Sequence, residues 1–438
     1  MLDQSAKLGK VHLTNSLDFS LSSLESAACR YFLDNVDPVT GLIFDSNSPQ
    51  SDVSISATGF GLAAYVVMVA RGELDRKEAA ERILRALRFL WNAEQSEKKD
   101  ATGYMGFFYH FLTRTEGKRA GGCELSVIDT ALLVAGILCA QVFFDQSTDE
   151  EREICTLADQ IYRRIDWSWP TGACPAISHG WKPESGFLHH GWEGYSEALI
   201  LYILGLGSPT HPLPHSSYCA WRSTYQWENL YGYYFLYSGI LFVHQFSQIW
   251  VDFRGLQDES LKEKGIDYFE NTRRAISVQQ EYCKLNPHYF KGYGEYFWGI
   301  TALGGPGDEE RWIDGVRRNF LGYSARSIPY GPDDGTIAPW AVAASIPFSQ
   351  DIALKTLDHI LKSYPGVRKE DGMLRSFNPT YTNANGEAWV SKDLFGIEQG
   401  PVALMIANHK DALIWNLFKK CPYLRKGLEK AEFVGGWL

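Results

Sequence analysis

Carboxylate side chains recur in four segments of this chain that are also rich in aromatic residues or glycine. The segments are Glu124–Thr130, Gly191–Ala198, Lys291–Glu295 and Gly396–Pro401, each at or near the start of an apolar stretch with helical spacing. A helix N-terminus leaves backbone N–H groups unpaired and favours negative charge, so one acid there is ordinary capping. Several such acids beside Trp, Tyr or Gly predict a shared acidic cleft that holds a sugar.

Glycoside hydrolysis needs two carboxyl groups across the scissile bond. One protonates the leaving oxygen, and the other activates water or attacks directly. Glu197 precedes the apolar run Ala198–Leu206, and Glu398 lies in a turn that ends at a proline. We expect Glu197 to be the acid and Glu398 its partner, although an acid in a first helical turn also compensates the helix dipole. Asp129 and Glu295 are further catalytic candidates, for which a structural role is an equal alternative.

A second set of residues is expected to bind the sugar, because aromatic rings stack on sugar rings and polar side chains recognise hydroxyl groups. The set is Glu124, Trp192, Tyr195, His244, Trp250, Asp252, Arg254, Tyr293, Asp334 and Trp340. His244 and Asp252 share one face of an expected helix. An ion pair of Asp252 with Arg254 is the alternative there, and capping of the following helix is the favoured role of Asp334.

The composition narrows the class of partner. The chain has 438 residues, is 45% hydrophobic and carries a formal charge of −10, without a long basic stripe. These values fit a neutral substrate and argue against nucleic acid, whose binding requires cationic neutralisation of phosphates. The sequence contains no uncharged apolar stretch of about 18 residues, so it predicts no membrane-spanning helix. The sequence has neither a Cys-x-x-Cys pair nor a nucleotide-binding glycine loop, so we expect no metal and no cofactor.

Hydrophobic periodicity predicts a helical protein. The expected helices are Leu17–Val36, Thr58–Arg71, Arg76–Gln95, Leu125–Phe144, Asp149–Ile165, Tyr195–Leu206, Leu236–Val251, Ser260–Leu285, Tyr296–Ala302, Ile337–Ala344, Phe348–Ser363 and Pro401–Lys419. Apolar helices alternate with amphipathic ones, which predicts an inner and an outer layer. The expected fold class is therefore all-α, a toroid of about twelve helices. Short loop hairpins are expected around Leu42–Phe44, Gly372–Asn378 and Trp389–Ser391.

The breaks between these helices are too short and too weakly biased to be domain linkers. We therefore expect one domain over residues 17–438, preceded by a flexible segment at residues 1–16. Met1–Asn15 contains charges and no apolar signal-peptide core. This predicts a cytoplasmic protein as the sequence is written, or a periplasmic or secreted one if a signal has been removed.

Ten motifs in order resemble the glucoamylase-like family. That family contains the bacterial β-1,2-glucanases of glycoside hydrolase family 144 and the transglycosylase domain of cyclic β-1,2-glucan synthases. The resemblance extends from about residue 25 to the C-terminus. The motifs are Ala57–Leu62, Gly106–Phe111, Glu124–Ala131, Gly194–Ala198, Leu206–Pro212, His244–Arg254, Gly265–Asn271, Lys291–Glu295, Asp334–Pro339 and Ile397–Pro401.

The resemblance implies an (α/α)6 toroid that hydrolyses β-1,2-glucan or its sophorooligosaccharides. Glu197 matches an essential acid of the hydrolases, and Glu398 stands where many relatives carry the shorter Asp. We favour inversion, because the last inner helix of a toroid would place Glu398 across the cavity from Glu197. Retaining relatives use a Glu in a Gly-Tyr-x-Glu setting, matched here by Glu295.

Three alternatives to an inverting hydrolase remain. A retaining transglycosylase would work through Glu197 and Glu295. A non-catalytic glucan-binding protein would keep the aromatic residues and lose the acids, which are present here. A terpenoid cyclase is the weakest alternative, because the sequence contains no Asp-x-Asp-Asp motif.

Overall fold

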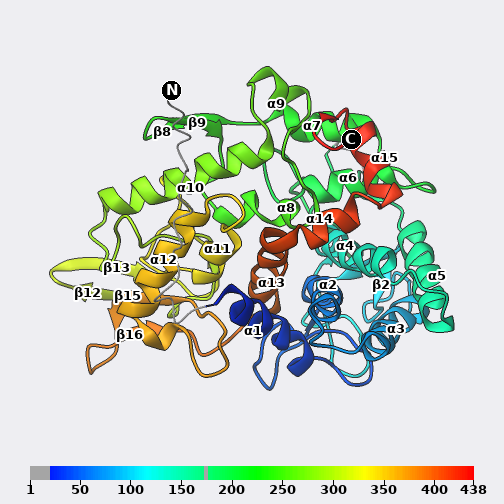
Figure 1. The fold of residues 1–438 in the computed structure, drawn as a ribbon, viewed down its shortest axis with the longest axis horizontal. Helices are drawn as coiled ribbons and strands as arrows, with labels where there is room; N and C mark the ends of the chain where they lie inside the picture. Colours follow the sequence, from blue (N-terminus) through cyan, green and yellow to red (C-terminus); the bar gives the residue numbers. More distant parts are fainter. Residues whose placement is uncertain (1–19, 172–175) are drawn as a thin grey trace, which may run out of the picture.

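Helices dominate the computed structural model, which describes residues 20–171 and 176–438 (Figure 1). The helices are α1 Leu21–Asp34, α2 Ile55–Arg71, α3 Arg76–Asn92, α4 Val127–Phe143, α5 Asp149–Arg164, α6 Leu199–Gly207, α7 His215–Ser223, α8 Phe246–Trp250, α9 Glu259–Glu263, α10 Tyr268–Leu285, α11 Pro339–Ala344, α12 Gln350–Ser363, α13 Gly396–Asp411, α14 Leu413–Phe418 and α15 Pro422–Lys430. The prediction of a predominantly helical fold is confirmed.

Two kinds of helix alternate along the chain. Helices α2, α4, α6, α8, α11 and α13 are buried around most of their circumference. Helices α3, α5, α10 and α12 bury mainly one face. Helix α2 packs against α4 and α13, and α13 also packs against α1 and α11. Apolar and amphipathic stretches of the sequence thus become interior and surface helices, as the hydrophobic pattern predicts.

Two glycines let α2 and α4 approach each other at backbone distance. A Cβ atom on Gly136 of α4 would lie 1.9 Å from the Gly59 carbonyl oxygen, and one on Gly59 would lie 2.3 Å from the Leu132 carbonyl oxygen. Only glycine allows backbones to come this close. The contact fixes the spacing of two helices whose first turns carry Ser56 and Asp129.

Short strands connect the helices. They are β1 Val53–Ser54, β2 Gly103–Tyr104, β3 Phe107–Tyr109, β4 Phe111–Leu112, β5 Leu125–Ser126, β6 Gly180–Lys182, β7 Gly186–Phe187, β8 Trp227–Leu230, β9 Tyr233–Leu236, β10 Leu256–Gln257, β11 Ala302–Leu303, β12 Glu309–Ile313, β13 Val316–Phe320, β14 Ser324–Ala325, β15 Phe377–Thr382, β16 Ala388–Val390 and β17 Val434–Gly435. Strands β2, β3, β5, β6 and β7 form a five-stranded sheet, and the other strands pair in twos.

The expected hairpins agree with the structure in part. Strands β15 and β16 pair close to the two stretches predicted near Gly372–Asn378 and Trp389–Ser391. In the third stretch, Ile43 and Phe44 form isolated bridges with Val36 and Val53. The five-stranded sheet was not predicted, because strands of two or three residues are too short to show a two-residue period.

Two predicted helices are wrong because glycines interrupt them. Ser260–Leu285 is split into α9 and α10 at Gly265, whose φ of +69° lies in the left-handed region. Asp267 then caps α10 by accepting a hydrogen bond from the Glu270 N–H at 2.7 Å. Tyr296–Ala302 is not helical, because Gly299 adopts a φ of +125°.

The prediction for Leu236–Val251 is also wrong as one continuous helix. This stretch contains the end of β9, a 3-10 turn at Leu241–His244 and the short helix α8. A Cβ atom on Gly239 would lie 2.2 Å from the Ile328 carbonyl oxygen, so the chain passes another backbone segment at that point. Helices α7 and α15 were missing from the prediction.

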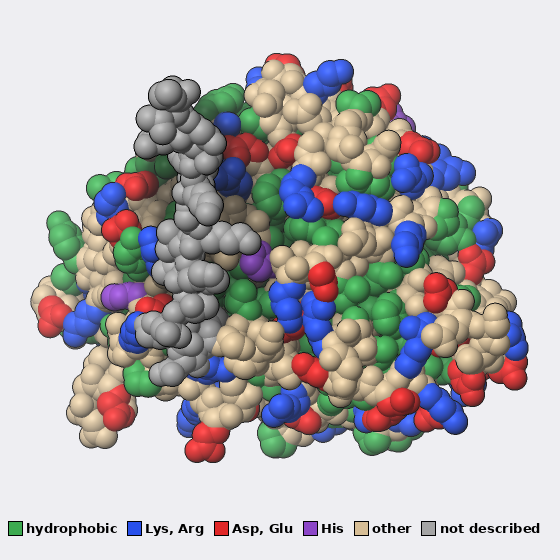
Figure 2. All heavy atoms as spheres, in the orientation of Figure 1, with side chains coloured by type: hydrophobic (Ala, Val, Ile, Leu, Met, Phe, Trp, Pro, Cys, Tyr) green, Lys and Arg blue, Asp and Glu red, His purple; other side chains and the backbone are tan. Residues whose placement is uncertain are grey.

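The expected flexible segment at residues 1–16 lies outside the described residues, and so does Met1–Asn15. Within the described ranges, no helix has the length and apolar character needed to cross a membrane. On the face shown in Figure 2, side chains of both charge signs are interspersed over the surface. The sequence likewise contains no long basic stripe.

Gly136→Ala should lower the free energy of unfolding by about 2 kcal/mol or more, because overpacking a tight contact costs about 1–3 kcal/mol. Gly366→Ala is the matched control, since a Cβ atom there meets no atom within 4 Å. Urea denaturation of the two variants measures the difference. Equal stability of both variants would show that α2 and α4 separate without cost.

Candidate active site

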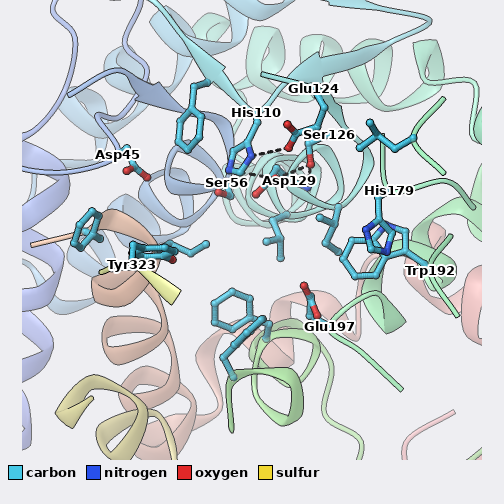
Figure 3. Close-up of a pocket in the computed structure, with 18 residues that line it drawn as sticks. Asp45, Ser56, His110, Glu124, Ser126, Asp129, His179, Trp192, Glu197 and Tyr323 are labelled. Atoms are coloured by element: carbon cyan, nitrogen blue, oxygen red, sulfur yellow. Dashed lines mark hydrogen bonds and ion pairs between the residues drawn. The ribbon is translucent and has the colours of Figure 1, made fainter. Parts of the chain in front are cut away.

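The N-terminal ends of several interior helices meet at one cavity of about 570 Å³. Helix α2 contributes Ser56 to its wall, α4 contributes Asp129, α8 contributes Phe246 and α13 contributes Ile397. Glu197 lines the cavity from the turn that leads into α6. Of the acids predicted to share one cleft, Glu124, Asp129 and Glu197 lie at this cavity (Figure 3), whereas Glu295 and Glu398 do not line it.

Four carboxylate residues line the cavity: Asp45, Glu124, Asp129 and Glu197. The backbone and the carboxylate of Asp129 are both hydrogen-bonded to Ser126, the N-cap residue of α4. Its backbone N–H donates to the Ser126 hydroxyl oxygen at 3.2 Å, and that hydroxyl donates to the Asp129 carboxylate at 2.6 Å. Asp129 is only 6% exposed, so these bonds satisfy a buried acid in the way that its position in an apolar stretch requires.

His110 lies between the acids on the α4 side of the cavity (Figure 3). Its Nδ1 is 3.0 Å from the Glu124 carboxylate, and its Nε2 is 3.6 Å from Asp129 Oδ2. Burial opposes protonation of the imidazole, but the charges of Asp129, Glu124 and Asp45 raise the pKa of His110 to about 9. The hydrogen bond with His110 in turn lowers the pKa of Glu124 to about 2. An imidazolium and a carboxylate thus form a stable pair at neutral pH.

Glu197 faces the cavity from a different side, beside Trp192 (Figure 3). Its carbonyl oxygen accepts a hydrogen bond from the Ser247 hydroxyl at 2.9 Å, which anchors the turn before α6. Burial, with a contribution from the charge of Asp129, raises the pKa of the Glu197 carboxyl to about 7. Trp192 packs on His179 with ring centroids 4.1 Å apart. A carboxylic acid that keeps its proton near neutral pH is suited to donate it.

Glu398 occupies the first turn of α13 but does not line the cavity. Its side chain is 3% exposed, and no group in the described ranges hydrogen-bonds its Oε1 atom. Burial and the charge of Asp45 raise the pKa of the Glu398 carboxyl to about 8. Phe395 and Ile397, which precede Glu398 in the sequence, do line the cavity. Glu398 is therefore flanked in sequence by wall residues, while its own side chain is buried outside the lining of the cavity.

Glu295 and Tyr293 are not brought to this cavity. The Glu295 side chain is exposed at the surface, and its carbonyl oxygen accepts a hydrogen bond from Gln280 at 2.8 Å. The Tyr293 hydroxyl donates to the Asp333 carboxylate at 2.7 Å, and its ring is buried. The expected pairing of Glu295 with Glu197 has no counterpart in this geometry.

Asp252 and Arg254 form the ion pair that was the alternative to sugar binding. The Arg254 Nε and Nη2 atoms lie 2.7 and 2.8 Å from the two Asp252 carboxylate oxygens. Lys419 adds a third contact at 2.8 Å. None of these residues lines the cavity.

The rings of His244 and Tyr195 pack against each other, and neither residue lines the cavity. The His244 Nε2 atom is 3.0 Å from the Ser238 carbonyl oxygen, and the two rings lie 5.1 Å apart. Burial lowers the pKa of His244 to about 4, so it is a neutral core residue. Tyr195 contributes to the wall of a separate surface pocket with Ser238.

The remaining expected binding residues are part of the core. Trp250 is fully buried and stacks on Phe60 at 5.6 Å, and Trp340 is 2% exposed. Asp334 does not cap α11, whose N-cap is Ala338. It pairs instead with Arg326, at 2.7 Å from the guanidinium Nε, and both side chains are buried.

Several cavity residues were missed by sequence reasoning, namely Asp45, His110, His179 and Tyr323. His110 belongs to the motif Gly106–Phe111, which carries part of the family resemblance but predicts no site residue. Asp45 follows a short bridge-forming stretch and carries no periodic signal. Across residues 20–171 and 176–438, no group of three or more His, Cys, Asp or Glu side chains is arranged to hold a metal ion.

Solved structures and a curated protein resemble the chain over almost its full length. A “putative glucoamylase” from Bacteroides uniformis has 29% identity and a TM-score of 0.83, covering 97% of this chain and 100% of its own. An endo-β-1,2-glucanase from Chitinophaga pinensis, solved with sophorotriose and glucose, has 26% identity and a TM-score of 0.81, covering 96% of this chain and 100% of its own.

The curated relative is an exo β-1,2-glucooligosaccharide sophorohydrolase (non-reducing end) from Parabacteroides distasonis. It is 27% identical over 94% of this chain, and the chain spans 58% of the length of that relative. Residues 189–422, more than half of the chain, match the family described as “Glycoamylase: Putative glucoamylase”. The matched region includes Glu197 and helix α13. Because the match covers more than half of the chain, the chain belongs to this glucoamylase family.

Proposed function

We propose that this protein is a glycoside hydrolase that cleaves β-1,2-glucan or its oligosaccharides. The observation that carries the proposal is a cavity lined by four carboxylate residues, one of which, Glu197, keeps its proton up to a pH of about 7. The named activities of the relatives from P. distasonis and C. pinensis support the choice of β-1,2-linked substrate. Aromatic faces for the sugar are supplied at the cavity by Trp192 and Tyr323.

The proposed architecture is a single (α/α)6 toroid over residues 17–438. Its support is the order of helices, since the interior helices α2, α4, α6, α8, α11 and α13 alternate along the chain with more exposed ones. The N-terminal ends of most of these interior helices meet at the cavity. A ring of inner helices would place the acids at one end of the toroid.

The proposed mechanism is inversion. Glu197 protonates the glycosidic oxygen, and water is activated from the side of the cavity where Glu398 lies, directly or through a short relay. An inverting pair sits about 6.5–9.5 Å apart because water must fit between the carboxyl groups. A retaining mechanism through Glu295 is disfavoured, because that side chain is exposed and outside the cavity wall. A purely binding role would not require a carboxyl group that stays protonated near neutral pH.

Glu197→Gln should lower kcat on β-1,2-glucan by about 100-fold or more, within the usual range for loss of a general acid. In the wild type, kcat/KM should fall as the pH rises through about 7, because the acid then loses its proton. The exposed Glu370 provides the control Glu370→Gln, which should retain activity. Circular dichroism checks the fold. Normal turnover by a folded Glu197→Gln protein would refute the assignment.

Proton NMR of the first-formed reducing end should show the α anomer, because inversion at a β-linked glucose gives an α product. Initial formation of the β anomer would instead indicate retention. In that case Glu295→Gln should abolish turnover and a covalent adduct on Glu295 should be detectable by mass spectrometry. With inversion, Glu295→Gln keeps the stereochemistry and most of the activity.

A further inference from the structure

Asp45 is a cavity carboxylate to which neither the sequence nor the family resemblance assigned a role. It lines the cavity, and Figure 3 shows it on the side away from Glu197, near Tyr323. No hydrogen bond reaches its carboxylate from residues 20–171 or 176–438, whereas its backbone is held firmly. The Asp45 N–H donates to the Asp52 carbonyl at 2.9 Å, and its own carbonyl accepts from the Tyr31 hydroxyl at 3.0 Å.

The segment that carries Asp45 is tied to the start of α13. The Gly396 N–H donates to the Asp45 carbonyl oxygen at 2.9 Å, and Ser46 forms a β-bridge with Phe395. Glu398 follows two residues after Gly396 and is buried. The two carboxyl groups are close enough that the charge of Asp45 acts on Glu398. Their relative position is therefore fixed by backbone hydrogen bonds.

Of the two acids, Asp45 is the one that faces the cavity and the one that is ionised at neutral pH. Burial raises the pKa of Asp45 to about 6, and the nearby His110 limits this rise. The pKa of Glu398 is higher, at about 8, so at pH 7 this buried acid keeps its proton. The titratable groups that act on either acid are His110, Asp129, Asp52, Tyr31 and Tyr323.

Resting on the proposed hydrolase function, we propose that Asp45 is the carboxylate that accepts the proton of the attacking water, with Glu398 as its buried partner. The water oxygen forms a bond to the anomeric carbon while the bond from that carbon to the glycosidic oxygen breaks. One water proton passes to Asp45, and the Glu197 proton passes to the leaving oxygen. Solvent then returns the proton from Asp45 to Glu197, so each cycle consumes one water.

Asp129 also lines the cavity, and its contacts make it less suited to this role. Its Oδ2 atom already accepts the Ser126 hydroxyl at 2.6 Å and lies 3.6 Å from the His110 Nε2 atom. A base that is occupied by a hydroxyl and paired with an imidazolium is a weaker proton acceptor. Asp129 instead positions Glu197 electrostatically, because its charge favours the protonated acid.

Asp45→Asn should lower kcat by about 100-fold or more with KM nearly unchanged, and the loss of activity below a pH of about 6 should disappear. Glu398→Gln should cost less, because glutamine keeps the size of the buried side chain and, like the protonated acid, carries no charge. The double variant should be no slower than Asp45→Asn. Glu370→Gln is the control, since this acid is exposed, lies outside the cavity wall and does not act on Asp45, and it should keep wild-type turnover.

Azide distinguishes lost chemistry from lost structure, because it attacks without needing a base. It should restore turnover of Asp45→Ala on β-1,2-glucan and give an α-glycosyl azide. Wild-type turnover by Asp45→Asn, together with an inactive Glu398→Gln, would reassign the base to Glu398. Failure of azide rescue in a folded Asp45→Ala protein would also overturn the proposal. If the wild type does not cleave β-1,2-glucan at all, the proposed function itself fails.

Thermal unfolding tests the raised pKa of Glu398 independently of activity. Folding raises the pKa of Glu398 from 4.5 to about 8, so wild-type stability should fall as the pH rises between those values. Glu398→Gln lacks this titration, and its melting temperature relative to wild type should therefore increase from pH 5 to pH 8 and level off above. Glu370→Gln should show a constant offset. A constant offset for Glu398→Gln as well would show that Glu398 ionises normally, against its proposed role.

Discussion

The cost of placing several carboxyl groups in one partly enclosed cavity governs the rest of this site. Negative charges taken out of water must be paired, hydrogen-bonded or protonated. The fold uses all three solutions. Glu124 pairs with the His110 imidazolium, Asp129 accepts the Ser126 hydroxyl, and Glu197 keeps its proton. The acids differ in chemistry because their surroundings resolve the same electrostatic problem in different ways.

That arrangement depends on helix packing remote from the cavity. Hydrophobic periodicity was sufficient to predict most helices and their division into interior and surface members. It failed where single residues decide the backbone, as at Gly265 and Gly299, whose positive φ values interrupt otherwise helical patterns. It also failed for very short strands, which are stabilised by pairing with distant segments and have no period of their own.

Glu124, Asp129 and Glu197, which stand at or near the starts of apolar stretches, line the cavity, whereas Glu398 in the first turn of α13 does not. An aromatic residue close to a polar one did not reliably indicate a binding residue. Trp250 and Asp252 are such a pair, yet Trp250 stacks on Phe60 in the core and Asp252 pairs with Arg254. His110 and Asp45 gave no local signal. Their places in the cavity come from a sheet and a β-bridge that join segments far apart in sequence.

The buried pair of Arg326 and Asp334 has a consequence for how a ligand is received. Arg326 also donates to the Leu321 and Gly322 carbonyl oxygens, and Asp334 accepts from the Leu321 N–H. Tyr323, which is 60% exposed and reaches the cavity wall, therefore stands on a segment anchored on both sides. An aromatic surface that is already ordered loses little conformational entropy when a ring stacks on it. Stacking on Tyr323 would then contribute to affinity without an accompanying cost of loop closure.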